Sequence, residues 1–204
     1  MKELFDNKRI LLVVAHPDDE LLGVGGTIHK LKTLFNATIT VVILGEGITS
    51  RSNMRDIKKW ENELKRHRSN IEDAKKILGY DELSLHSFPD NRFDSVPLLD
   101  IVKVIENEIR TFNPEVIFTH HEGDLNIDHQ LTFNAVITAT RPLENNEVKS
   151  ILTFETPSST EWQFGQSQSR FQPNFFIEID EIGLQKKIAS MECYEYEKRP
   201  FPHP

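Results

Sequence analysis

The string "HPDD", His16 to Asp19, places one histidine and two aspartates in a single turn of this 204-residue chain. Pro17 fixes the chain direction where an apolar run ends, so His16 and Asp19 can both point to one side of the turn. One nitrogen and one oxygen ligand suit Zn²⁺, and a catalytic zinc usually takes three protein ligands and keeps one position open for water. The turn therefore predicts two metal ligands, with a third from another loop.

His129, which closes the string "DLNIDH", is the predicted third ligand because it begins a predicted helix that faces the same rim. Asp18 is the predicted general base, since a carboxylate beside a dication keeps a low pKa and can take a proton from water. A zinc ion lowers the pKa of its water to about 7 and polarises a carbonyl, which is the chemistry of amide hydrolysis. Fe²⁺ accepts the same ligands, so the metal stays open between zinc and iron.

Other interpretations of these residues remain open at this stage. The acidic string could be only a turn and helix cap, and Glu20 is expected to stabilise the N-terminal dipole of the next helix. The glycines of "GVGGT" do not fit the G-x-G-x-x-G pattern of a nucleotide-binding module, and the adjacent negative charges would repel a pyrophosphate. Of His120 and His121, one is expected to face the rim and the other the protein interior.

Short apolar runs that alternate with longer stretches of helical period predict the elements that position this turn. Six strands are expected, at residues 9–15, 38–44, 83–88, 115–120, 151–157 and 175–180. Five helices are expected, at residues 21–34, 53–78, 96–112, 128–140 and 181–196. The pattern predicts an α/β, Rossmann-like three-layer domain that spans residues 1–204, with a mostly parallel sheet and helices on both faces. In such sheets ligands bind beyond the carboxyl ends of the strands, where the polar loops of this chain converge.

The composition excludes several classes of protein. A formal net charge of -8 argues against a nucleic-acid partner, which needs clustered Lys and Arg. Cys193 is the single cysteine, so no intramolecular disulfide or thiolate zinc site forms, as suits a reducing cytosol. The longest apolar runs are far shorter than the ~20 residues that span a bilayer. The sequence therefore predicts a cytoplasmic protein with no membrane partner.

Two motifs in this order, "AHPDDELLGVGGTI" and "THHEGDLNIDHQLTFNAV", with "PDNRFDSVPLLDI" between them, resemble the PIG-L/LmbE-type zinc-dependent N-deacetylases. That family removes acetyl groups from N-acetylated amino sugars and their conjugates. The similarity runs from the first strand to "YEYEKRPFPHP". The resemblance implies that His16, Asp19 and His129 hold the metal and that Asp18 is the base, in agreement with the roles derived above.

The resemblance also implies further roles. Asp90 matches a position that contacts sugar hydroxyls, and Arg68 resembles an arginine that reaches the substrate in some relatives. Asp128 is similar to a residue that orients the site through a hydrogen bond. Relatives usually continue past "PHP" with another helix, which predicts a shortened C-terminal tail here. His203 would then either approach the site of a neighbouring subunit in a homo-oligomer or belong to a loose chain end.

One departure from the family concerns the second motif. Many members carry His-Pro-Asp-His where this chain has Asn126-Ile127-Asp128-His129. An amide can donate a hydrogen bond to an oxyanion but cannot protonate a leaving amine. Asn126 is therefore expected to act as that donor only, and Asp18 to supply the acid after gaining the proton of the water. His121 and His203 are the alternative acids.

The predicted function is zinc-dependent removal of an N-acetyl group from an amino sugar that is nucleotide-linked or attached to a small carrier. Polar side chains suited to sugar hydroxyls are Glu46, Asp90, Asn91 and Asn126, and those suited to a phosphate are Arg51, Arg68 and Arg92. Two alternatives stay open. One is an amidase for another acyl amide, such as a thiol conjugate, and the other is a non-catalytic metal- or sugar-binding protein.

Overall fold

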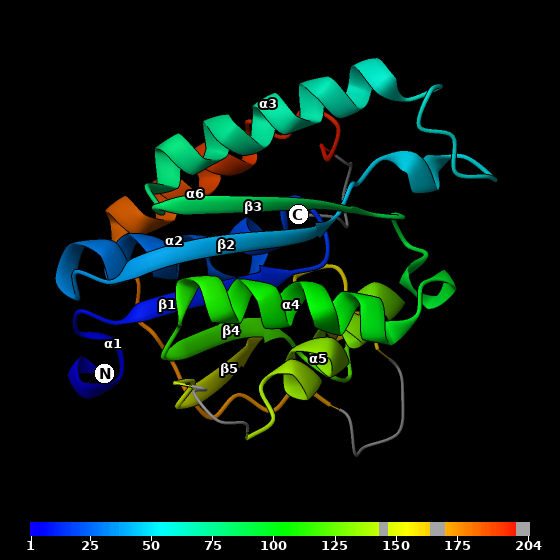
Figure 1. The fold of residues 1–204 in the computed structure, drawn as a ribbon. Helices are drawn as coiled ribbons and strands as arrows, with labels where there is room; N and C mark the ends of the chain where they lie inside the picture. The colour runs from blue at the N-terminus through cyan, green and yellow to red at the C-terminus, as the bar shows by residue number, and fades with distance from the viewer. Residues whose placement is uncertain (143–146, 164–169, 199–204) are drawn as a thin grey trace.

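The computed structural model describes residues 1–142, 147–163 and 170–198. Five strands form one sheet in the order β3-β2-β1-β4-β5, and every neighbouring pair is parallel (Figure 1). The strands are β1 (Arg9–Val14), β2 (Thr38–Gly45), β3 (Glu82–Phe88), β4 (Val116–His120) and β5 (Ser150–Phe154). An all-parallel sheet needs crossover connections, and the intervening helices provide them.

Helices cover both faces of this sheet, which confirms the predicted Rossmann-like α/β fold. The α-helices are α1 (Lys2–Phe5), α2 (Asp19–Leu34), α3 (Glu61–Leu78), α4 (Leu98–Phe112), α5 (Ile127–Ala139) and α6 (Glu181–Met191). Three short 3₁₀ helices are η1 (Thr49–Arg51), η2 (Phe93–Ser95) and η3 (Thr160–Trp162). Helices α2 and α3 lie on one face with α6 against them, and α4 and α5 lie on the other (Figure 1).

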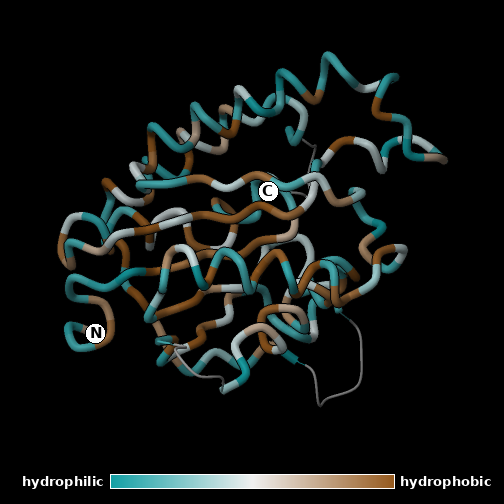
Figure 2. Tube along the Cα trace, in the orientation of Figure 1, coloured by the Kyte–Doolittle hydropathy of each residue, from teal (hydrophilic) through white to brown (hydrophobic). Residues whose placement is uncertain are grey.

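The central strand β1 is buried on both faces, because its side chains alternate between two hydrophobic cores. Ile10 and Leu12 pack in the core beneath α2 and α3, whereas Leu11 and Val13 pack in the core beneath α4 and α5. Figure 2 shows these central strands as largely hydrophobic and α3 as largely hydrophilic along its length. Burial of apolar area contributes about 25 cal/mol per Å² to the free energy of folding. The buried strand β1 therefore holds the turn that follows it in a fixed position.

The strand order reverses at β1, with β2 and β3 on one side and β4 and β5 on the other. In open α/β sheets, ligands bind in the crevice at such a switch point, outside the carboxyl ends of the strands. The loop after β1 carries "HPDD" and the loop after β4 carries "HEGDLNID", so the two polar motifs meet at this crevice.

Residues 175–180 do not form the predicted sixth strand, and the sheet has five strands in the described residues. This segment instead runs across α2, where Lys30 Nζ donates a 2.6 Å hydrogen bond to the carbonyl of Glu178. Ile179 fills the space beside Gly26, where an added Cβ would meet its Cδ1 at 2.7 Å. Ile179 is therefore covered by α2 and Ile177 packs against the core beneath it, whereas Phe175 and Phe176 are 40% and 75% exposed. A run of apolar residues in the sequence does not distinguish this arrangement from a strand.

Two helix boundaries also differ from the prediction. Helix α3 begins at Glu61 rather than near residue 53, since the Asp56 side chain accepts a 3.0 Å hydrogen bond from the Lys59 amide and forms a turn first. Helix α6 ends at Met191 rather than at residue 196, because the chain bends to bury Tyr194 completely. The short helix α1 was not predicted. Within the described ranges, no helix is both long and apolar enough to cross a membrane.

Candidate active site

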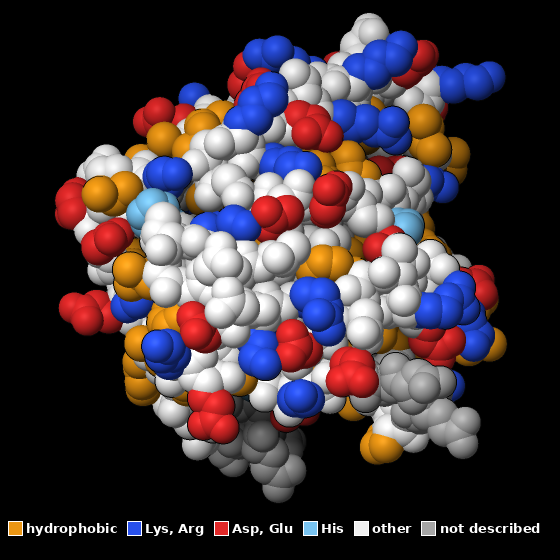
Figure 3. Space-filling model, turned by 60° about the vertical axis from the view of Figure 1, so that its left-hand side comes forward, with side chains coloured by type: hydrophobic (Ala, Val, Ile, Leu, Met, Phe, Trp, Pro, Cys, Tyr) orange, Lys and Arg blue, Asp and Glu red, His pale blue; other side chains and the backbone are white. Residues whose placement is uncertain are grey.

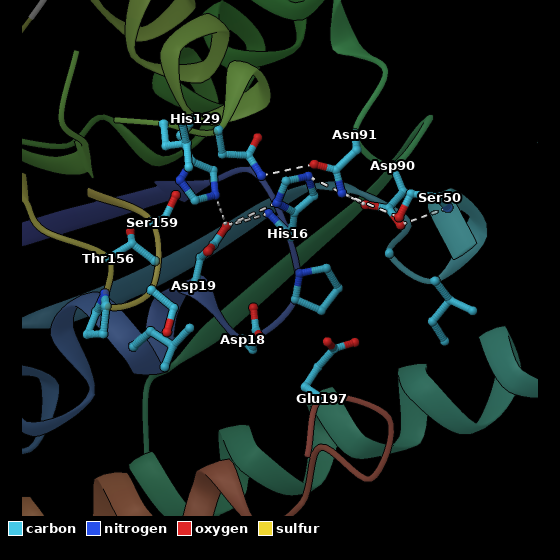
Figure 4. Close-up of a pocket in the computed structure, with 18 of the residues that line it drawn as sticks. His16, Asp18, Asp19, Ser50, Asp90, Asn91, His129, Thr156, Ser159 and Glu197 are labelled. Carbon is cyan, nitrogen blue, oxygen red and sulfur yellow. Dashed lines mark hydrogen bonds and ion pairs between the residues drawn. The ribbon is translucent and has the colours of Figure 1, made fainter. Parts of the chain in front are cut away.

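A pocket of about 550 Å³ opens at the carboxyl ends of β1 and β4. Its floor comes from the turn after β1 and the start of α5, with His16, Asp18, Asp19 and His129 in its lining. A further wall comes from the segment after α6, from which Glu197 points toward Asp18 (Figure 4). The sequence motifs and the C-terminal part of the chain thus share one cavity.

The three predicted metal ligands meet in this pocket. One ligand atom from each of His16, Asp19 and His129 lies within 4.8 Å of the others, and all three residues are buried. Asp19 Oδ2 is 3.5 Å from His16 Nδ1 and 3.3 Å from His129 Nε2, so the carboxylate lies between the two rings (Figure 4). Two imidazoles and a carboxylate form the donor set of a catalytic zinc site.

A carboxylate also faces the outer nitrogen of each histidine. His16 Nε2 lies 2.9 Å from Asp128 Oδ2, and His129 Nδ1 lies 3.1 Å from Asp124 Oδ1. Such a partner fixes the ring orientation and tautomer of a metal-binding histidine and raises its basicity. His129 Nε2, on the inner side, is fully buried and has no hydrogen-bond partner among the described residues. The arrangement fits a divalent cation between the three side chains.

The electrostatics of the protein groups favour positive charge at the same point. Burial opposes ionisation of Asp19, but His129 and His120 outweigh it and hold the pKa of Asp19 well below its usual range. Burial also opposes a charge on His16, yet Asp128 and Asp19 raise the pKa of His16 well above its usual value. For Asp124 the contacts with His129 outweigh burial and lower the pKa to about 2. A cation bound here replaces the protons that these carboxylates attract.

Asp18 lines the pocket beside the ligands without joining them. Its backbone is left-handed at φ 100°, an uncommon and strained conformation for a residue other than glycine, of the kind that clusters at functional sites. Burial and the charge of Asp19 raise the pKa of Asp18 well above its usual value, opposite to the predicted direction. The prediction of a low pKa depends on a dication, which favours the charged carboxylate.

Glu20 does more than place a charge in the first turn of α2, which was its predicted role. It is fully buried, and its Oε1 accepts a 2.7 Å hydrogen bond from the hydroxyl of Tyr194. Its Oε2 accepts a 3.0 Å hydrogen bond from the backbone amide of Asp18. Burial raises the pKa of Glu20 to about 7. Glu20 therefore ties the segment after α6 to the turn that carries the ligands.

Asn126 and Asp128 occupy different positions relative to the pocket. Asn126 lines it and caps α5, since its Oδ1 accepts a 2.8 Å hydrogen bond from the Asp128 amide. Its Nδ2 donates to Asn91 Oδ1 at 2.9 Å. Asp128 is fully buried, and its Oδ1 accepts a 2.9 Å hydrogen bond from the Phe93 amide. Asp128 consequently positions His16 and does not line the cavity.

His120 lies directly behind the ligand His129. The two rings stack at 3.9 Å with 9° between their planes, and His120 Nε2 accepts a 3.0 Å hydrogen bond from the Ala15 amide. Burial lowers the pKa of His120 to about 4, so the ring is neutral at physiological pH. His121 packs against Phe171 and is not among the residues that line the pocket. The structure therefore does not bring His121, one of the two alternative acids, to the cavity.

The predicted substrate contacts divide into two groups. Asp90, Asn91 and Arg51 line the pocket, and Asp90 Oδ2 accepts a 3.1 Å hydrogen bond from the Ser50 amide. Arg68 lies outside it, on the exposed side of α3.

Two other predicted positions, Glu46 and Arg92, also lie away from this cavity. Glu46 pairs with Arg55 at 2.7 Å, and the guanidinium of Arg92 donates to the backbone carbonyls of residues 52 and 53. Neither of these side chains lines the pocket. His203 lies outside the described residues, so its predicted contribution stays a prediction.

Sequence reasoning missed three residues of the site. Asp124 belongs to the second motif, and a carboxylate five positions before a ligand histidine could have suggested it as a partner. His67, to which no role is assigned from the sequence alone, lies on α3 and lines the pocket, and its buried ring nitrogens have no hydrogen-bond partner in the described chain. Glu197 is distant in sequence from both motifs, and no local pattern marks it.

The fold and the site together define a Rossmann-like α/β protein with a His-Asp-His centre at the switch point of its sheet. The PIG-L family, described as GlcNAc-PI de-N-acetylase, matches residues 11–140, which is more than half of the chain. The chain therefore belongs to the PIG-L family. This membership makes it a hydrolytic N-deacetylase, in place of the non-catalytic binding protein that the sequence left open.

Two curated relatives match nearly the whole chain. An "Uncharacterized deacetylase YaiS" from Escherichia coli (strain K12) is 28% identical over 198 residues, which cover 93% of this chain and 92% of the relative. A "Probable N-acetyl-alpha-D-glucosaminyl L-malate deacetylase 2" from Bacillus anthracis is 26% identical over 200 residues, which cover 93% of this chain and 81% of the relative. Both are named deacetylases.

The fold is also shared with a solved structure, the N,N'-diacetylchitobiose deacetylase from Pyrococcus horikoshii. The TM-score is 0.70, at 17% sequence identity, and the alignment covers 92% of this chain and 69% of that chain. At this identity the likeness concerns the fold alone.

Proposed function

We propose that this protein is a zinc-dependent amide hydrolase that removes the N-acetyl group from an amino sugar. The proposal depends mainly on one observation: ligand atoms of His16, Asp19 and His129 lie within 4.8 Å of one another, and Asp18 lines the same pocket. Zinc is proposed over other metals because two imidazoles and one carboxylate are its usual catalytic ligands. Family membership supports the reaction class.

The residues around the proposed centre have separable roles. His16, Asp19 and His129 would hold a divalent cation, which when bound would supply Lewis acidity to activate water near neutral pH and to polarise an amide carbonyl. Asp18 accepts the proton of the attacking water and passes it to the leaving nitrogen, so one carboxylate serves as base and then as acid. Asn126 holds an amide at the pocket wall, where its NH₂ group has one hydrogen beyond the bond to Asn91 for an oxyanion.

A sugar substrate is supported by the polar side chains at the pocket wall next to His16. Asp90 Oδ1 lies 3.6 Å from His16 Nε2 and accepts a 3.0 Å hydrogen bond from Asn91 Nδ2. Carboxylate and amide oxygens are therefore available to a substrate bound near the proposed metal centre. Such groups are suited to sugar hydroxyls. The Bacillus anthracis relative and the Pyrococcus horikoshii structure are named for N-acetylated sugar substrates, which supports the same substrate class here.

The rival substrate is another acyl amide, such as a thiol conjugate, hydrolysed at the same centre. The two proposals share every residue named above and differ only in what the outer pocket accepts. Figure 3 shows basic and acidic side chains intermingled over the face it presents, with no broad field of one sign on that face. Selectivity between the two substrates is expected from the residues that line the pocket.

One experiment tests the proposed function. The purified protein is assayed for bound metal and for acetate release from N-acetylated sugars, both free and conjugated, and from N-acyl thiol conjugates. We expect about one zinc per chain and acetate release from at least one sugar, with loss of release after chelation and recovery with zinc. A metal-free protein that releases no acetate from any sugar contradicts the proposal, and release from thiol conjugates alone favours the rival.

A further inference from the structure

The charge on the outer wall of the pocket is set by one arginine and one glutamate. Among the described residues that line the cavity, Arg51 is the single arginine or lysine. Its Nη2 donates 2.7 Å hydrogen bonds to Glu197 Oε1 and to the Tyr196 carbonyl. The Glu197 side chain is only 11% exposed, so this pair is held against the wall rather than loose in solvent. Arg51, predicted from the sequence as suited to a phosphate, is already neutralised by Glu197.

His67 lines the same pocket and is affected by the charges of both members of this pair. Burial lowers the pKa of His67, and the charges of Glu197 and Arg51 act on it in opposite directions. The other acidic side chains of the lining are Asp18, Asp19 and Asp90. A cation at the proposed centre compensates the carboxylates around it, which leaves the outer wall with no uncompensated positive charge.

Three exposed or half-buried apolar side chains line one part of the cavity. Leu125 and Ile127 flank Asn126 and line the mouth while 50% and 43% exposed, and Trp162 on η3 joins them. Exposed apolar and aromatic side chains at the mouth of a polar pocket are suited to the uncharged face of a sugar ring. They offer no hydrogen-bond donor for an anionic substituent beyond the indole NH.

We propose that Glu197 makes this pocket selective for N-acetylated amino sugars whose other substituents carry no phosphate or carboxylate. Glu197 does so by holding Arg51 in an ion pair and by presenting its own negative charge to the outer pocket. An anionic substituent would have to displace Glu197 from Arg51 and lie beside its carboxylate, which disfavours it. The inference rests on the proposed function, because it concerns which N-acetyl sugars reach the same centre.

The test compares kcat/KM for a neutral substrate, N,N'-diacetylchitobiose, with that for an anionic one, N-acetylglucosamine 1-phosphate. We expect the unmodified enzyme to prefer the neutral sugar by about tenfold or more. Glu197→Gln frees Arg51 and removes one negative charge, so the preference should shrink by about tenfold through faster turnover of the phosphate. Added salt should weaken the preference of the unmodified enzyme, as expected for a charge effect.

The chain offers a matched control in Glu195→Gln. Glu195 lies two residues earlier in the same segment and pairs with Arg66, but its side chain is 46% exposed and does not line the pocket. Its replacement changes the net charge equally and should leave the substrate preference unchanged. Arg51→Gln provides a second variant, which leaves Glu197 unbalanced and should increase the preference for the neutral sugar.

The outcomes separate this inference from the proposed function. Acetate release from both sugars at equal efficiency, or a preference that Glu197→Gln leaves unchanged, overturns the role of Glu197 and leaves the deacetylase proposal intact. A preference for the phosphate in the unmodified enzyme also overturns it. No acetate release from any N-acetyl sugar by the zinc-loaded enzyme overturns both proposals together.

Discussion

Asp128 Oδ2 lies 2.9 Å from His16 Nε2, which joins the start of α5 to the turn after β1. The outer nitrogen of His16 is thereby occupied, so its Nδ1 is the atom that faces Asp19. The His129 ring is backed in the same way by Asp124. Each histidine of the proposed metal centre thus has its own carboxylate partner, and both carboxylates are fully buried.

Asp128→Asn should weaken zinc binding about 10- to 100-fold, because the amide is a weaker partner for the His16 ring. An asparagine keeps an oxygen for the Phe93 amide, so the fold around η2 should persist. Zinc affinity is measured by competition with a chromogenic chelator. Asp94→Asn on the exposed side of η2 removes the same charge and should leave the affinity unchanged. Equal affinities in the two variants would contradict the role of Asp128.

Asp18→Asn should lower kcat by roughly 100- to 10,000-fold, because the proton of the attacking water loses its acceptor. Zinc content should stay at the level of the unmodified protein, since Asp18 is not one of the three clustered ligands. Acetate release and elemental analysis on the same preparation check both statements. Loss of zinc together with activity would make Asp18 a ligand instead of a base.

The sequence predicted the ligand cluster because its members follow the ends of two parallel strands, which is a local signal. His16 and Asp19 lie in one turn, and His129 begins a helix, so strand and helix patterns were sufficient to bring them together. The partners of Glu20 and Arg51 could not be predicted in this way. Tyr194 and Glu197 lie 174 and 146 positions from these residues in the chain, and only the packing of α6 brings them near.

The errors in the fold have a related cause. The apolar residues at 175–180 fit a strand, but Ile179 packs against α2 and Phe176 is 75% exposed. A hydrophobic pattern in the sequence predicts burial, but it does not specify which element covers a given side chain. The start of α3 was predicted too early for a different reason. The polar stretch before it has no clear hydrophobic period, so the sequence does not mark where the helix begins. In the structure the turn at Asp56 precedes the helix.

Acid stability offers a test away from the active site, at Glu108 on α4. Its Oε1 lies 3.0 Å from His86 Nε2 and accepts a 2.6 Å hydrogen bond from Ser84, and these contacts outweigh partial burial to lower the pKa of Glu108. A lowered folded-state pKa adds stability above the unfolded value of about 4.5, and this stability is lost as the pH falls through the folded-state pKa.

Glu108→Gln should therefore reduce the free energy of unfolding by about 1 kcal/mol at neutral pH. The difference from the unmodified protein should shrink progressively below about pH 4.5. Urea unfolding of both proteins at a series of pH values measures this difference in the free energy of unfolding. Glu72→Gln on the exposed side of α3 removes the same charge and should give a small difference at every pH. A difference at Glu108 that is independent of pH would exclude the charged pair as its source.

The glycine cluster in α2 serves close packing rather than phosphate binding. An added Cβ at Gly23 would meet Phe154 Cδ2 at 2.2 Å, so the aromatic ring on β5 lies directly against the helix backbone. Gly23→Ala should destabilise the protein by about 1–3 kcal/mol, because a buried ring cannot move without disturbing its neighbours. At Gly25 an added Cβ would meet Lys187 Cγ at 3.1 Å, which a flexible side chain can relieve.

Gly25→Ala is therefore the matched control and should have a smaller effect on the midpoint of urea unfolding. Combining Gly23→Ala with Phe154→Leu should destabilise less than the sum of the two single changes, since the smaller side chain makes room for the methyl group. Strict additivity in this cycle would show that Gly23 and Phe154 do not contact each other in solution. The packing of β5 against α2 would then need another explanation, because this contact is the closest one available to Gly23.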